Sequence, residues 1–134
     1  MYKRQGDYRL VEHLDKHGHI CVSAYDIEPR DPRVDQQDAL SDLHFSGPMF
    51  PVITNPPWDR KILHPMIDRF RKFGCWLLFD ADWMHTKQSS DYMKFCEKVV
   101  SVGRVKWFDD TTGKDNAAWY RFVPAQTDTT FIGR

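Results

Sequence analysis

The stretch FPVITNPPW, residues 50–58, organises the interpretation of the whole chain. Residues 52–54 are β-branched, and such side chains are enriched in strands. Apolar residues without polar alternation indicate a strand buried on both faces. Pro56 and Pro57 then end the strand, because proline has no backbone N–H to donate to a ladder. The segment therefore predicts a buried strand that stops at Asn55.

Helical and strand-like segments alternate on either side of this stretch. The periodicity predicts helices over 7–17, 61–72 and 91–99. Apolar, β-branched runs predict further strands over 19–27, 74–83, 101–109 and 117–124, with mostly loop over 28–48. This alternation indicates an α/β fold with a mainly parallel sheet. The polar, glycine-containing turn after residue 109 favours an antiparallel hairpin at the C-terminal edge.

Length and composition limit the class of protein. A chain of 134 residues suits a single domain, spanning 1–134, around one hydrophobic core. Its 19 Lys and Arg balance 19 Asp and Glu, which argues against a dedicated polyanion binder but not against a local basic patch. Three widely spaced cysteines fit neither a disulfide scaffold nor a structural zinc site. With no apolar leader and no membrane-length apolar run, the expectation is a cytoplasmic protein without membrane contact.

Polar residues follow three of the predicted strands, and ligands of open parallel sheets bind beyond the carboxyl ends of the strands. These residues are Asp26 after the first strand, Asn55 after the second, and Asp80 and Asp82 after the third. Any one of them is more often a turn or helix cap than a ligand-binding group. Their shared position on one rim favours a binding site.

The segment from Asn55 to Trp58 carries the most specific chemistry. Two consecutive prolines restrict the backbone, so the Asn55 amide and the Pro56 carbonyl would be held as a pair of acceptors. Such a pair can accept both hydrogens of an exocyclic amine. The aromatic ring of Trp58 can stack on the ring that carries that amine. The alternative, a proline-terminated strand followed by a core tryptophan, fits this narrow pattern less well.

Residues 53–58, Ile-Thr-Asn-Pro-Pro-Trp, resemble the catalytic motif of the N6-adenine DNA methyltransferases, (D/N)-P-P-(Y/F/W). Residues 77–83 and 103–122 resemble the C-terminal part of phage-type members. The resemblance implies that Asn55, Pro56, Pro57 and Trp58 are the catalytic residues. It also implies that Asp26 holds the ribose hydroxyls of S-adenosylmethionine and that Asp38 meets the adenine amine of that cofactor.

The chain departs from this family at its N-terminal end. Family members cradle the methionine end of the cofactor with a first strand and a glycine-rich turn. Here Gly6 is the one glycine kept in the corresponding segment, Tyr8 stands where a second is expected, and no strand is predicted before the helix of 7–17. The expectation is a truncated Rossmann-like methyltransferase domain with a degraded S-adenosylmethionine site. The strands ending at Asp26 and Asn55 are then expected to pair directly or to accept a strand from another chain.

Two functions of different classes follow. One is a phage-encoded adenine-N6 methyltransferase-like protein acting on double-stranded DNA in the host cytoplasm. The other is a catalytically inactive, methyltransferase-derived binding protein that pairs with a second copy or a protein partner. A phage inhibitor of host restriction or CRISPR effector complexes is an example of that class.

Three further patterns in the sequence are weaker indications of function. His17 and His19 lack further ligands at metal-binding spacing, so no metal site is expected. Cys96 is interpreted as buried filler on a helix rather than as a nucleophile. The basic residues over 60–72 fit a phosphate-facing surface and an ordinary solvated helix face equally well.

Overall fold

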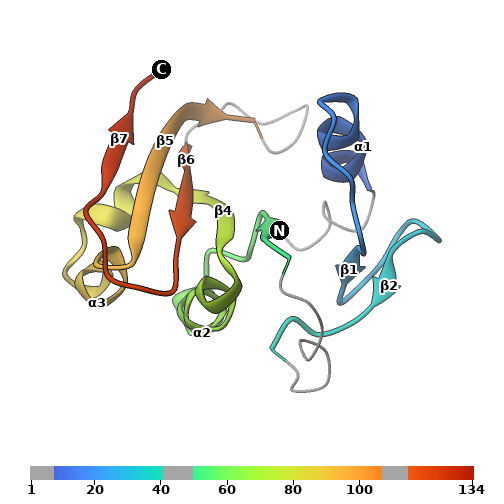
Figure 1. The fold of residues 1–134 in the computed structure, drawn as a ribbon, viewed down its shortest axis with the longest axis horizontal. Coiled ribbons are helices and arrows are strands. Elements are labelled where there is room, and N and C mark those ends of the chain that lie inside the picture. Colours follow the sequence, from blue (N-terminus) through green and yellow to red (C-terminus); the bar gives the residue numbers. More distant parts are fainter. Residues whose placement is uncertain (1–7, 41–49, 107–114) are drawn as a thin grey trace. The chain divides into compact units, whose positions relative to one another are not determined.

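The computed structural model describes residues 8–40, 50–106 and 115–134 (Figure 1). The chain divides into two compact units, which we call the N-terminal unit, Met1–Pro48, and the C-terminal unit, Met49–Arg134. Each unit is described by itself. The helices of the described residues are all too short or too polar to cross a membrane.

The N-terminal unit is held together largely by polar contacts. Helix α1, Arg9–Lys16, confirms the first predicted helix. Arg33 bonds Glu12 on this helix at 3.1 Å and Asp31 at 2.8 Å, and its guanidinium lies 4.0 Å from the ring centroid of Tyr8. A two-stranded parallel sheet joins β1, Tyr25–Asp26, to β2, Asp35–Gln36.

The buried strand predicted over 19–27 is wrong in most of its length. Only Tyr25 and Asp26 form a strand, while Ile20 is 88% exposed and Val22 62% exposed. Apolar content indicates burial only where a neighbouring strand or helix covers the residues, and β2 pairs with this segment at Tyr25 and Asp26 alone. Of the two arrangements expected for the strands ending at Asp26 and Asn55, direct pairing is not found, because β1 and β3 belong to separate sheets. Pairing with a strand from another chain stays a prediction.

The C-terminal unit contains a five-stranded mixed sheet in the order β3-β4-β6-β5-β7. Its strands are β3 Val52–Thr54, β4 Cys75–Asp80, β5 Cys96–Val105, β6 Asp115–Phe122 and β7 Thr130–Ile132. The pairs β3–β4 and β5–β7 are parallel, whereas β4–β6 and β5–β6 are antiparallel. The fold is thus α/β, and the five-stranded sheet is mixed rather than mainly parallel, with two parallel and two antiparallel pairs. Two consecutive strands that pair in parallel need a connection of a dozen or more residues. The connection from Val105 at the end of β5 to Asp115 at the start of β6 is shorter, so these two strands pair antiparallel.

The predicted C-terminal hairpin is not established. β5 and β6 are antiparallel neighbours, but residues 107–114, which contain most of the predicted turn, lie outside the described residues. The pair is also not at the edge of the sheet as expected. β6 lies between β4 and β5, and β7 forms the edge beyond β5.

Short helices accompany the sheet. They are α2 Arg60–Phe70, η2 Arg71–Phe73, η3 Ala81–His85, η4 Lys87–Ser89 and α3 Ser90–Met93. Asp59 caps α2 by accepting a hydrogen bond from the Lys61 N–H at 3.0 Å. Pro65 lies in the middle of α2, as the sixth of its 11 residues.

One sheet face and one side of α2 supply the core. β4 alternates between buried and half-buried residues, as a strand covered on one side does. The buried side chains of these two elements are Leu63, Met66, Ile67, Phe70, Cys75, Leu77 and Phe79.

The helix predicted over 91–99 is wrong beyond its first turn. α3 ends at Met93, and β5 already begins at Cys96. Residues 99–102 are β-branched or small, and pairing with β6 lets Val99 bury its side chain on the core face. Cys96, predicted on a helix, is instead a buried residue of β5.

Candidate functional site

The Asn-Pro-Pro-Trp segment directly follows β3, at the carboxyl end of a parallel strand pair. Thr54, the last residue of β3, pairs with Leu77 of β4, and β4 then continues to Asp80. β4 therefore extends beyond the last paired residue of β3, where Asn55 begins the motif. Because Pro56 and Pro57 have no N–H groups, the segment leaves the ladder at this point, and Asn55 and Asp80 share one edge of the sheet.

The motif is anchored at its centre and accessible at its ends. Pro56 is fully buried, whereas Asn55, Pro57 and Trp58 are half-buried. The Trp58 indole nitrogen is itself buried. Asp59 caps α2 immediately afterwards. The backbone of the motif is thus held between a strand end and a helix start, with an amide and an aromatic ring beside it.

The expected cofactor residues belong to the N-terminal unit, so they are described apart from Asn55. Asp26 is 6% exposed, and its Oδ1 accepts a hydrogen bond from the Glu28 N–H at 2.7 Å. Asp38 is exposed and accepts from the Leu40 N–H at 2.9 Å. Gly6 lies outside the described residues. Both carboxylates therefore act as turn acceptors, the structural role weighed for such residues from the sequence.

Asp80 also has a capping role. Its carboxylate accepts from the Asp82 N–H at 3.0 Å and starts η3, while its backbone carbonyl accepts from the Tyr120 hydroxyl at 2.8 Å. Asp82 is exposed just beyond it. At the carboxyl end of β4, the exposed Asp82 side chain is therefore accessible to a ligand, whereas the Asp80 carboxylate caps η3.

Sequence reasoning missed a polar–aromatic cluster on α2. The His64 Nε2 accepts a hydrogen bond from the Trp83 Nε1–H at 3.0 Å, and its ring stacks on Tyr92 with centroids 4.4 Å apart. Burial lowers the pKa of His64, and the nearby Arg60 lowers it further. Residues from three separate segments meet here, and no short motif marks such a meeting in a sequence.

The basic residues of 60–72 divide into two groups. Arg71 is a packing residue: it donates to the Pro124 carbonyl at 2.9 Å and lies 3.8 Å from the centroid of Phe95. Arg60 donates to the Gln88 side chain at 2.8 Å, and Lys61 is exposed. Arg60 and Lys61 are the cations closest in the chain to the Asn-Pro-Pro-Trp segment.

Neither buried thiol is suited to nucleophilic chemistry. Burial raises the pKa of Cys75 and of Cys96 to about 12, so both remain protonated near neutral pH. In the part of the chain that the structure describes, no three His, Cys, Asp or Glu side chains gather closely enough to hold a metal ion.

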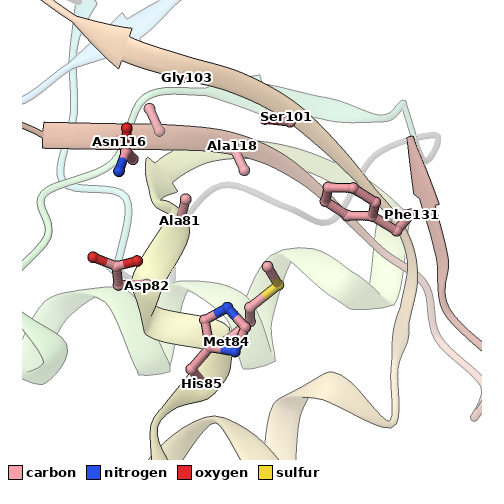
Figure 2. A pocket seen from close by; sticks show the side chains of 10 residues that line it. Ala81, Asp82, Met84, His85, Ser101, Gly103, Asn116, Ala118 and Phe131 are labelled. Atoms are coloured by element: carbon pink, nitrogen blue, oxygen red, sulfur yellow. The ribbon is translucent and has the colours of Figure 1, made fainter. Parts of the chain in front are cut away.

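A small pocket lies elsewhere on the same edge of the sheet. It has a volume of about 200 Å³ and opens between η3 and the strands β5, β6 and β7 (Figure 2). The sequence pointed to Asp82 as a strand-end residue, but the other lining residues come together only in the fold.

No protein-family model matches the chain, and no curated protein is significantly similar to it.

Proposed function

We propose that this protein is adenine-N6 DNA methyltransferase-like, a truncated Rossmann-like domain that recognises an unstacked adenine and has a degraded S-adenosylmethionine site. The observation that carries the proposal is the position of Asn55-Pro56-Pro57-Trp58. The motif follows a parallel strand at its carboxyl end, Pro56 is buried, and Asn55 and Trp58 are half-buried residues. Carboxyl ends of parallel strands are where α/β sheets bind ligands.

In this proposal the motif reads the amine of the base. The Asn55 Oδ1 and the Pro56 carbonyl accept the two hydrogens of the exocyclic N6 group, and Trp58 stacks on the purine ring. Extruding a base from a duplex costs a few kcal/mol, and least for an unpaired base. Arg60 and Lys61, at the start of α2, would lie near the phosphates of such a strand.

The residues expected to hold S-adenosylmethionine fit it poorly. Asp26 is 6% exposed and already bonds a backbone N–H, which leaves little of its carboxylate for ribose hydroxyls. Calorimetry with S-adenosylmethionine is therefore expected to show weak binding or none. A micromolar dissociation constant, equivalent to about −8 kcal/mol, would contradict the degraded site.

The adenine-reading step has its own test. We would compare binding to two DNA duplexes, one with an unpaired adenine and one with unpaired purine, which lacks the N6 amine. The wild-type protein should prefer the adenine duplex by about tenfold, since two hydrogen bonds are lost without the amine. Asn55→Ala should abolish the preference, whereas Gln126→Ala, which removes an exposed amide elsewhere, should keep it. Equal binding of both duplexes by the wild type would refute the proposal.

The inactive binding protein is the second candidate, and exposed apolar side chains favour it. Phe50, two residues before β3, is 53% exposed, and Ile53, in β3 at the outer side of the described sheet, is 36% exposed. Exposed apolar groups and strand edges are typical of surfaces that bind another chain. Light scattering would detect a second copy, and a methyl-transfer assay on adenine-containing DNA would separate the candidates. Asn55-dependent product favours the enzyme, whereas self-association without product favours the binding protein.

A further inference from the structure

The edge of the C-terminal sheet at β7 is apolar and has a strand on one side only among the described residues. β7, Thr130–Ile132, pairs with β5 and ends the strand order of the sheet (Figure 1). Phe131 is 60% exposed and Ile132 is 43% exposed. Proteins commonly protect such an edge with lysine or proline, and Thr-Phe-Ile contains neither. The edge is therefore suited to pairing with a further strand.

The chain that leads into β7 is already held against its neighbours. The Thr127 N–H donates to the Lys94 carbonyl at 2.9 Å, and the Thr129 hydroxyl donates to the Cys96 carbonyl at 2.6 Å. β7 then pairs in parallel with residues 98–100 of β5. A strand that is ordered before it binds loses less conformational entropy on binding. The edge is thus preformed for strand pairing.

Two residues of opposite charge flank β7 symmetrically. Asp128 lies three residues before Phe131, Arg134 lies three residues after it, and both are exposed. Within the described residues, neither Asp128 nor Arg134 is in an ion pair. Alternate residues of a strand share a face, so the two charges fall on one face of an extended β7 and Phe131 on the other. The segment is therefore complementary in charge to a copy of itself that runs in the opposite direction.

We propose that β7 pairs antiparallel with β7 of a second copy of this chain, about a two-fold axis that passes through Phe131. Phe131 then lies opposite Phe131 of the partner subunit. Asp128 lies opposite the partner's Arg134, and by symmetry Arg134 lies opposite the partner's Asp128. Two ion pairs enclose an apolar centre, and the two five-stranded sheets become one continuous sheet.

The two charges select this register over its neighbours. A shift of two residues in one direction places Asp128 opposite the partner's Ile132, and a shift in the other direction places Arg134 opposite the partner's Thr130. A shift of one residue places Phe131 opposite a side chain of the other face. Opposite charges are favourable cross-strand partners, and they meet when the pairing is centred on Phe131. Because β7 matches its own charge pattern, a second copy is the partner that it fits.

This interface is separate from the residues discussed above. β3 and β7 are at opposite ends of the strand order, so the interface uses neither the exposed side chain of Ile53 nor the motif that begins at Asn55. It therefore does not depend on either function proposed for the chain.

The test measures self-association of the full chain by analytical ultracentrifugation. Asp128→Arg and Arg134→Asp each place like charges opposite each other at both ends of the interface. Each variant should dimerise about tenfold more weakly than the wild type, since two attractive pairs become repulsive. Two exposed control sites lie in the N-terminal unit, and Asp15→Arg and Arg30→Asp there should leave the dimer unchanged.

Recombining the two charge reversals locates the interface. In a heterodimer of Asp128→Arg with Arg134→Asp, both cross-strand pairs are again of opposite charge. The equimolar mixture, and the double variant alone, should therefore dimerise within about threefold of the wild type. The mixture of Asp15→Arg with Arg30→Asp has the same net charges and controls for long-range attraction.

Two results would overturn the proposal. A wild-type chain that stays monomeric up to about 1 mM would leave this edge to a strand of another protein. A dimer that the single variants do not weaken, or that neither the mixture nor the double variant restores, would place the interface on a different surface.

Discussion

His64 connects α2 to two aromatic residues through a hydrogen bond that requires the neutral imidazole. Its Nε2 accepts from the Trp83 indole at 3.0 Å, and a protonated ring has no lone pair to accept with. Burial and Arg60 lower its pKa from 6.5, whereas Asp68 raises it. The unfolded chain therefore binds a proton at higher pH than the folded chain does.

This residue predicts a loss of stability in mild acid. The contribution of His64 is present above pH 6.5, declines as the pH falls below that value, and levels off once the folded imidazole is protonated. Urea unfolding at pH 7.5 and pH 5 measures it. His64→Gln retains an acceptor for Trp83 and should reduce the pH dependence, while His13→Gln, an exposed site on α1, should not. An unchanged pH dependence in His64→Gln would show that another group is responsible.

Tyr120 carries a second testable hydrogen bond. Its buried hydroxyl donates to the Asp80 carbonyl at 2.8 Å, at the point where β4 passes into η3, and burial raises its pKa. Tyr120→Phe leaves that carbonyl without this donor and should lower the free energy of unfolding by about 1–2 kcal/mol. Tyr25→Phe, at a 44% exposed site, should change it by less than about 0.5 kcal/mol. Equal values from urea denaturation would contradict this role for the hydroxyl.

Among the elements, the β3–α2–β4 segment is the one that positions the candidate site. Gly74 closes it: its carbonyl accepts from the Val52 N–H at 3.1 Å, and its backbone has φ 73° and ψ 131°. This combination is one that L residues rarely adopt, and glycine tolerates it because it has no Cβ. The return of the chain from η2 into β4 therefore depends on this glycine.

Gly74→Ala should destabilise the C-terminal unit by about 1–3 kcal/mol through backbone strain alone. An added Cβ would meet nothing within 4 Å, so steric overlap is not the cause. Gly133→Ala is the matched control, because its Cβ would be in ordinary contact, 3.8 Å from Phe131. A thermal-unfolding midpoint equally low in both variants would contradict the strain argument.

For the molecule as a whole, the burial of apolar side chains is unequal between the two units. Val34 is the one buried apolar side chain among residues 8–40, whereas the C-terminal unit buries aromatic and aliphatic residues of its sheet, of α2 and of η3. Hydrophobic burial is the main favourable term in folding. We therefore expect the C-terminal unit to fold without the N-terminal unit.

A fragment of residues 49–134 should unfold cooperatively in urea and give dispersed amide signals by NMR, while residues 1–48 alone should not. Cooperative unfolding of residues 1–48 alone would contradict the inference from burial. A fragment of residues 49–134 whose amide signals were not dispersed would also contradict this inference.

Local patterns predicted several elements correctly. The spacing of Leu10, Val11 and Leu14 predicted α1, and the β-branched run before Pro56 predicted β3. The predicted burial of that strand is wrong, because β3 is the outer strand of the described sheet and Ile53 is 36% exposed. Such signals depend only on near neighbours in the chain, which side chains and prolines restrict directly. The roles of Asn55 and Trp58 in binding an adenine amine were inferred from the same short segment, and they stay predictions.

What the sequence established about this protein is its class: an α/β chain in which a proline-terminated strand places an amide and an indole at a sheet edge. Only the tertiary structure decided which strands pair, that the segment before Tyr25 is exposed, and that Asp82 and Asn116 line one pocket. The reason is physical. Local propensity acts between neighbouring residues, whereas burial and strand order depend on partners distant in sequence, and the same apolar run is core or surface according to which partner reaches it.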